Sequence, residues 1–160
     1  MKEIVRGGRC DRGIVQCRNN CYNYANNRRT DTYAQPGLGA GIKLEEKDFT
    51  CEQVYRAAIA DGLTPVDASG SCPPGTTKVA LTVRPGYDYH WYRQDRDGMW
   101  SQKMGIFPAT DLDNSSQSIF DPEKADTGKY EFCDYLCSCS DERQGQGHEG
   151  ITGDKNEPRK

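Results

Sequence analysis

Two residues of this chain have the side chains that nucleophilic catalysis by cysteine requires. Cys21 stands in the segment NNCYNYA, where a polar loop passes into a predicted short helix. His90 stands in the alternating segment DYHWY, which is typical of a strand. A cysteine acts as a nucleophile when it is a thiolate, and a nearby imidazole or a helix N-terminus stabilises that charged form. One hypothesis is therefore a thiol nucleophile at Cys21 with His90 as its base.

The order of these two residues is that of papain-like hydrolases, in which a cysteine at an early helix start precedes a histidine on a downstream sheet. In such sites a third polar side chain orients the histidine, and Gln102, Asp111 and Asn114 are the candidates here. The chain has one other histidine, His148, which lies in the polar C-terminal segment. His90 is therefore the candidate base.

Each of these residues also has an ordinary structural interpretation. Cys21 is one of eight cysteines, and an even number of cysteines in a polar chain is typical of disulfides formed in an oxidising compartment. His90 lies among aromatic residues, where a partly buried histidine commonly serves packing and hydrogen bonding alone. The candidate disulfide residues are Cys10, Cys17, Cys21, Cys51, Cys72, Cys133, Cys137 and Cys139.

Zinc binding is the other common use of clustered cysteines. Cys133, Cys137 and Cys139 lie close together, but their C-x3-C-x-C spacing is not that of a zinc knuckle, and the chain has only 2 histidines. We therefore expect disulfides rather than zinc, and we predict no metal site and no cofactor.

The composition of the 160 residues excludes two classes of protein. No apolar stretch approaches the roughly 18 to 20 residues that a membrane span needs, which excludes an integral membrane protein. Because the formal net charge is −3, the chain lacks the basic surplus of a general nucleic-acid binder. Only 34% of the residues are hydrophobic, so the core of a single domain would be thin and disulfides would help to hold it.

Acidic residues are concentrated in one segment of the chain. Residues 111–142 contain two lysines and nine Asp or Glu residues, which gives a net charge of −7 (2 − 9). Such a segment is typical of a solvated surface, and its carboxylates also suit weak surface contact with Ca²⁺, although no EF-hand pattern is present. Residues 143–160 are rich in Gly and in charge, so we predict a globular domain over residues 1–142 and a disordered polar tail.

Two further features concern the compartment of the protein. Asn114-Ser115-Ser116 is a glycosylation sequon, which agrees with secretion. The first residues, MKEIVRGGRC, lack the apolar region of a signal peptide. Because the cysteine count favours an oxidising compartment, we expect a secreted, extracellular protein whose signal peptide is not present in this sequence.

The expected secondary structure belongs to the α+β class. Thr50 and Gln53 form a T-x-x-Q capping pattern, apolar residues then recur at helical spacing, and Gly62 ends the predicted helix 51–60. A shorter helix is expected around residues 21–27. Strands are expected over residues 79–83, 87–94, 99–103 and 130–133, with a turn at residues 95–98. This order predicts short N-terminal helices packed on a small antiparallel sheet, papain-like in chain order and stapled by disulfides.

Two long blocks of sequence carry a resemblance. The first joins residues 21–27 (CYNYANN) to residues 30–37 (TDTYAQPG), and the second joins residues 90–95 (HWYRQD) to residues 98–103 (GMWSQK). These blocks resemble a family of small secreted cysteine-rich proteins of bacteria and marine invertebrates, which includes a protein of the insoluble organic matrix of bivalve shells. The resemblance covers about residues 17–135, and papain-like peptidases and amidases are similar more distantly. The family implies a histidine where this chain has Gln102, a departure that bears on any hydrolytic chemistry.

Two hypotheses from different classes follow from these observations. In the first, the protein is a secreted, disulfide-held structural component of an extracellular matrix, such as the calcified matrix of a shell. Its partners are then other matrix macromolecules or calcium carbonate mineral. In the second, the protein is a Cys–His hydrolase in which Cys21 attacks the carbonyl of a peptide or cell-wall amide and His90 is the base.

Overall fold

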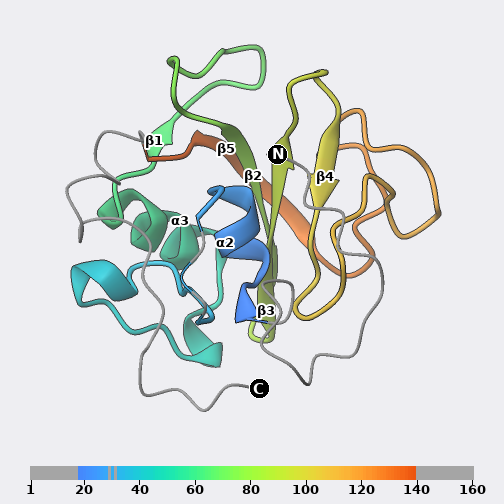
Figure 1. Cartoon of the computed structure of the whole chain (residues 1–160). Coiled ribbons are helices and arrows are strands. Elements are labelled where there is room, and N and C mark those ends of the chain that lie inside the picture. The colour runs from blue at the N-terminus through green and yellow to red at the C-terminus, as the bar shows by residue number, and fades with distance from the viewer. Residues whose placement is uncertain (1–17, 29, 31, 140–160) are drawn as a thin grey trace.

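The structure, a computed structural model, describes residues 18–28, 30 and 32–139. Within these residues a five-stranded antiparallel sheet has the order β1-β5-β2-β3-β4 and is accompanied by short helices (Figure 1). The elements are α2 (Cys21–Ala25), η1 (Leu38–Ala40), η2 (Glu46–Asp48), α3 (Cys51–Ala60), β1 (Thr64–Pro65), β2 (Lys78–Arg84), β3 (Asp88–Gln94), β4 (Trp100–Gln102) and β5 (Glu131–Cys137).

This architecture confirms the α+β class, the antiparallel sheet and the stapling by disulfides, whereas the papain-like chain order stays a prediction. Cys10, Cys17 and the predicted tail over residues 143–160 lie outside the described residues.

Helix α3 forms where its capping residues and apolar spacing predict it. The Thr50 side chain accepts a hydrogen bond from the backbone N–H of Gln53 at 3.2 Å, which satisfies one donor of the first turn. Val54 is fully buried against the sheet. Beyond the helix end, Gly62 has φ 101°, a left-handed conformation that glycine adopts without strain. The predicted helix 51–60 is therefore confirmed.

Strands β2, β3 and β4 also form close to the predicted positions. The strand β2 is buried over almost its whole length, which explains why its VALTV run shows no polar alternation. The turn between β3 and β4 places Gly98 at φ 83°, and the Asp97 carboxylate accepts a hydrogen bond from the backbone N–H of Met99 at 2.9 Å. Local turn chemistry therefore fixes how the two strands meet.

Strand β5 is longer than the predicted strand 130–133 and lies between β1 and β2. Its register shifts opposite Leu81 and Thr82, where β5 contains one extra residue, Cys133. Such a bulge interrupts the alternation of side chains, so the sequence pattern indicated only the first part of the strand. The strand β1 has only two residues, which is too short to leave a periodic pattern.

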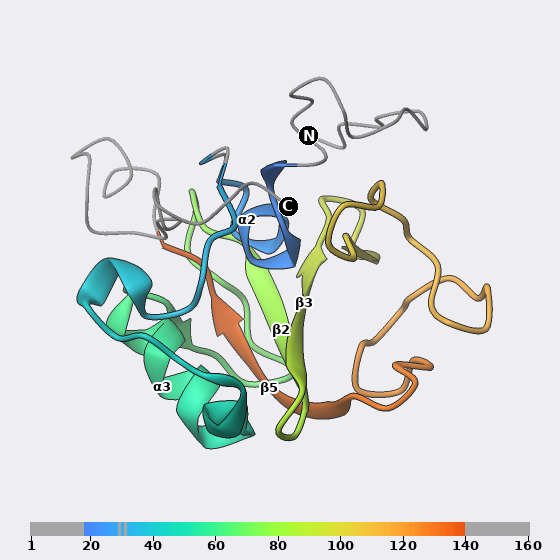
Figure 2. The same ribbon diagram turned by 90° about the horizontal axis from the view of Figure 1, so that it is seen from below.

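Apolar side chains form a core on each face of the sheet. The helices α2 and α3 cover one face, where Tyr22 and Val54 are fully buried (Figure 2). The segment 103–130 covers the other face, where Ile119 is fully buried. Two segments that are distant in sequence are thus held against β3, the strand that carries His90.

Among the described residues, two disulfides staple the side of the molecule that contains α3 and β5. Cys51, the first residue of α3, is bonded to Cys133, and Cys72 is bonded to Cys137 at the end of β5. The bonded residues are 82 and 65 positions apart in the sequence. Cross-links over such distances reduce the entropy of the unfolded chain, which helps a domain whose core is thin.

Candidate functional site

Cys21 is the first residue of α2, and polar residues around it fix the start of that helix. The side chain of Asn20 accepts hydrogen bonds from the backbone N–H groups of Tyr22 and Asn23, both at 3.1 Å. In return, the Asn23 side chain accepts a hydrogen bond from the backbone N–H of Asn20 at 3.0 Å. These reciprocal bonds are a capping box, so the position of Cys21 is determined by its immediate neighbours.

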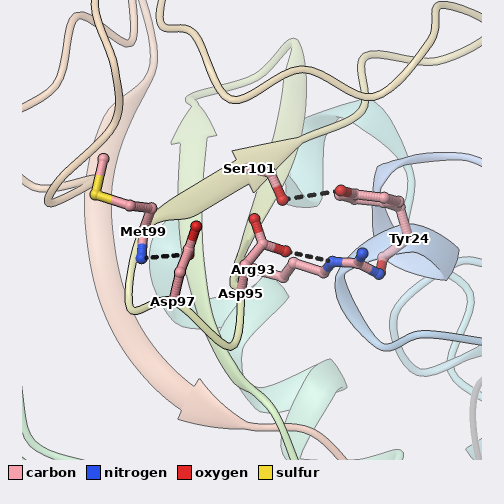
Figure 3. A network of polar contacts seen from close by, with 6 residues as sticks. All are labelled: Tyr24, Arg93, Asp95, Asp97, Met99 and Ser101. Atoms are coloured by element: carbon pink, nitrogen blue, oxygen red, sulfur yellow. Dashed lines mark hydrogen bonds and ion pairs between the residues drawn. The ribbon is translucent and has the colours of Figure 1, made fainter. Parts of the chain in front are cut away.

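A second polar network fastens α2 to β3 and β4. The guanidinium of Arg93 lies 3.9 Å from the centre of the Tyr24 ring and donates a hydrogen bond to the Tyr24 carbonyl at 3.2 Å. The same guanidinium forms an ion pair with the Asp95 carboxylate at 3.3 Å. The Tyr24 hydroxyl forms a 2.8 Å hydrogen bond with the hydroxyl of Ser101 (Figure 3). The two sequence blocks that carry the family resemblance therefore contact each other and form one rigid support for the helix.

Cys21 and His90 line the same pocket, which has a volume of about 760 Å³. Its walls are rich in aromatic and charged side chains. The aromatic ones are Tyr33, Phe49, Tyr87, Tyr89 and Tyr130, and the charged ones are Lys43, Glu45, Glu46 and Asp88. The hydrogen bonds of the described residues include none between Cys21 and His90. The fold thus brings the two predicted residues to one pocket, with room between its walls for a ligand.

Gln102 occupies the orienting position beside His90. Its side-chain oxygen lies 2.7 Å from Nε2 of His90, and its side-chain nitrogen donates a 2.8 Å hydrogen bond to the carbonyl of Leu112. Because that nitrogen is used by Leu112, the oxygen accepts from His90, so Nε2 carries the ring proton. The other ring nitrogen, Nδ1, is then the one that can accept a proton. Of the three candidate orienting residues, Gln102 makes this contact. Gln102 stands at the position where the family resemblance implies a histidine.

The electrostatics of the pocket favour uncharged forms of both residues. Cys21 is only 7% exposed and belongs to neither disulfide of the described chain. Burial raises the pKa of its thiol to about 12, while a backbone hydrogen bond at Trp91 and the charge of Lys103 act in the opposite direction. Burial lowers the pKa of His90 to about 4. At neutral pH the resting pocket therefore contains a thiol and a neutral imidazole.

Carboxylates of the acidic segment are largely engaged in holding their own loops. The Asp113 carboxylate accepts hydrogen bonds from the backbone N–H groups of Ser115, Gln117 and Asp126, and these bonds lower its pKa. Among the described residues, no group of three or more His, Cys, Asp or Glu side chains is arranged to hold a metal ion. Asn114, the predicted glycosylation site, is exposed on this segment.

Sequence reasoning did not identify Asp61, a buried carboxylate at the end of α3. It accepts hydrogen bonds from the Tyr22 hydroxyl at 2.6 Å and from the backbone N–H of Gly37 at 2.8 Å, and its backbone carbonyl accepts one from Cys139 Sγ at 3.2 Å. Burial raises the pKa of Asp61 to about 6. Asp61 thus connects α3 to α2, and no local pattern in the sequence indicates contacts over such separations.

Comparison with known proteins gives one relative that decides the family. The chain is 45% identical over 119 residues to "Insoluble matrix shell protein 1" of Ruditapes philippinarum, an alignment that covers 72% of this chain and 76% of the relative. The chain belongs to this protein's family. The resemblance predicted from the blocks at residues 21–37 and 90–103 is therefore confirmed.

The other comparisons add no relative. No family model matches the chain, and no solved structure matches it. Within the part of the chain that the structure describes, every helix is too short or too polar to cross a membrane.

Proposed function

We propose that this protein is a secreted, disulfide-stapled structural component of an extracellular matrix. The observation that carries the proposal is its membership of the family of an insoluble matrix shell protein, with 45% identity over 72% of the chain. At this identity and coverage the same fold would be present in both proteins.

The disulfides support this proposal on physical grounds. A matrix protein persists outside the cell, where disulfides form and remain oxidised. The bonds Cys51–Cys133 and Cys72–Cys137 both end on β5, the strand beside the middle of the sheet. Cross-links to a strand inside the sheet hold the domain together even when local hydrogen bonds open, which suits a durable material.

We further propose that the matrix is calcified and that exposed acids of the segment 111–134 contact other matrix macromolecules or calcium carbonate mineral. The exposed acids of this segment are Asp111, Glu123, Asp126, Glu131 and Asp134. Carboxylates are hard oxygen ligands that suit Ca²⁺, and dispersed exposed ones give weak contact over an area instead of one tight site.

Sequential extraction of the extracellular matrix of the source organism tests this function. The matrix is washed in water, demineralised with EDTA, extracted with detergent, and finally extracted with detergent plus a reductant, and each fraction is probed with an antibody to this chain. We expect the protein in the residue that stays insoluble after demineralisation. Recovery in the cell lysate with its cysteines reduced would contradict the proposal.

A second candidate function is hydrolysis by a Cys–His pair, favoured by the arrangement of Cys21, His90 and Gln102 around one pocket. In this chemistry the Cys21 thiol transfers its proton to Nδ1 of His90, and the sulfur attacks the carbonyl carbon of an amide. The leaving amine takes that proton from His90, and water then hydrolyses the thioester. Gln102 keeps Nε2 occupied, so that Nδ1 is the basic nitrogen throughout.

The Cys21→Ala variant tests the second function with peptides and bacterial cell-wall fragments as substrates. Loss of amine release in Cys21→Ala, with activity retained in Cys139→Ala, would support it, because Cys139 is also a buried cysteine. Equal activity of the wild type and Cys21→Ala would exclude Cys21 as the nucleophile.

A further inference from the structure

Lys103 is a buried lysine that joins the start of α2 to a wall of the Cys21 pocket. It directly follows β4, and it is only 5% exposed. Its ammonium donates hydrogen bonds to the carbonyl of Asn19, at 2.5 Å, and to the carbonyl of Gly105. Asn19 lies two residues before Cys21, and Gly105 lines the pocket. The cation is thus fixed between the start of α2 and the pocket wall.

The partners of this ammonium are neutral. Among the described residues, no carboxylate lies within ion-pair distance of Lys103. Burial lowers the pKa of Lys103 to about 8, and Cys21 is the titratable neighbour whose negative charge would raise it. A buried ammonium whose partners are neutral carbonyls is stabilised further when an anion forms beside it.

We propose that Lys103 is a positioning residue whose ammonium stabilises the Cys21 thiolate, the anion that forms when the thiol gives its proton to His90. The sulfur keeps the electron pair of the S–H bond, and Nδ1 of His90 takes the proton. This role rests on the thiol chemistry of the second candidate function. The effect of Lys103 on the ionisation of the Cys21 thiol can, however, be measured without any substrate.

Other groups around Cys21 act in defined directions. The carboxylate of Asp88 opposes ionisation of the thiol, while the phenols of Tyr92 and Tyr130 are uncharged because their pKa values are raised. His90 is neutral before the proton transfer. Among the described residues, Lys103 is therefore the group whose charge favours the thiolate before the proton transfer.

Lys78 provides a matched control in the same molecule. It is also buried, at 9% exposed, and its ammonium also donates to backbone carbonyls, those of Asp67, Ala68 and Gly70. It lies on β2, and Cys21 is not among the groups that shift its pKa. Loss of Lys78 therefore removes a buried ammonium with similar bonding but leaves the charge at Cys21 unchanged.

The test is the rate of Cys21 alkylation by iodoacetamide in the native protein, followed by peptide mass spectrometry from pH 6 to pH 10. Removing an opposite charge beside a thiol raises its pKa by one unit or more, so Lys103→Met should slow the reaction about tenfold at pH 7. The difference should shrink above about pH 8, where Lys103 of the wild type loses its proton. Lys78→Met should react at the wild-type rate.

Lys103→Arg keeps the test decisive if Lys103→Met fails to fold. Arginine stays charged over this pH range, so the variant should match the wild type at pH 7 and react faster than it above about pH 8. Equal rates for the wild type, Lys103→Met and Lys103→Arg at every pH would overturn the proposal, as would equal slowing by Lys103→Met and Lys78→Met. Absence of hydrolysis with correct alkylation profiles would instead count against the hydrolase function alone.

Discussion

Two halves of the molecule are held together by different means. The stapled half consists of α3, β1, β5 and the loop of Cys72, and the pocket half consists of α2, β3 and β4. Both disulfides of the described residues lie in the stapled half. The pocket half is held by buried polar groups that bond across the chain, among them Asn20, Arg93, Gln102 and Lys103.

The two means of support serve different purposes: disulfides make the fold durable, whereas buried polar contacts fix the positions of side chains. A disulfide stabilises the fold with little demand on the surrounding side chains. Buried polar groups stabilise a fold only when each partner is in place, and they add more to the uniqueness of an arrangement than to its stability. The pocket half therefore has the construction of a site in which side-chain positions matter, whereas the stapled half has the construction of a durable support.

The largest effect is expected from breaking the stapled half. Replacing Cys72 and Cys137 together by alanine should lower the free energy of unfolding by about 4 kcal/mol, since a loop of 65 residues is released in the unfolded chain. Urea denaturation under non-reducing conditions measures the change. A loss below about 1 kcal/mol would show that the disulfide is not a main support of the domain.

A change of nearly that size is expected from the pH dependence of Asp61, which joins the two halves through Tyr22. Because burial raises its pKa from 3.8 to about 6, the folded protein binds more protons than the unfolded chain between these pH values. The folded protein therefore disfavours the ionised form of the Asp61 carboxyl group. The contribution of Asp61 to the free energy of unfolding should rise by about 2 to 3 kcal/mol as the pH falls from 7 to 4. This gain should be lost again as the pH rises through about 6.

The Asp61→Asn variant isolates this contribution from that of the surface carboxylates. The difference in unfolding free energy between the wild type and the variant, measured at several pH values, should depend on pH between 4 and 7. A difference that is constant over this range would contradict the account of Asp61.

A smaller effect is expected in the pocket half from Gln102. Gln102→Ala leaves Nε2–H of His90 and the carbonyl of Leu112 without their partner, which should lower the free energy of unfolding by about 2 kcal/mol. The ¹⁵N NMR shifts of the His90 ring report which nitrogen holds the proton. We expect the Nε2–H form in the wild type and in Gln102→His, and a mixture in Gln102→Ala. The Nδ1–H form in the wild type would contradict the orienting role of Gln102.

The smallest effect concerns the exposed acids of the segment 111–134. Replacing Glu123 and Glu131 by glutamine should reduce adsorption of the protein to calcite about twofold, because single exposed charges contribute little each. The matched control replaces Glu46 and Glu52, two exposed glutamates elsewhere on the surface, and should leave adsorption nearly unchanged. Equal losses in the two variants would show that net charge, and not the acids of this segment, governs adsorption.

How far the sequence predicts this structure depends on how local each signal is. The helix 51–60 was predicted because Thr50 and Gly62 mark its ends within the chain itself. The extent of β5 was not, because the bulge at Cys133 breaks the alternating pattern. Eight cysteines allow about 105 pairings, so the disulfide partners depended on the tertiary fold.

The candidate site shows the same division. Cys21 and His90 were identified from residue type and chain order, and the pocket contains both. Lys103 was visible in the second block but without a role, because its partner Asn19 is 84 residues away. Contacts of this kind follow from how α2 packs on β3 and β4, which no local pattern determines.

Disulfides hold the stapled half, while the pocket half contains a cysteine, Cys21, outside any disulfide of the described residues. Mapping the free and bonded cysteines of the unreduced protein tests this contrast directly. The protein is denatured with iodoacetamide and without reductant, digested, and analysed by mass spectrometry. We predict linked peptides that join Cys51 to Cys133 and Cys72 to Cys137, with Cys21 carrying the alkyl group. A disulfide at Cys21, or alkylation at Cys51 and Cys72, would contradict the account.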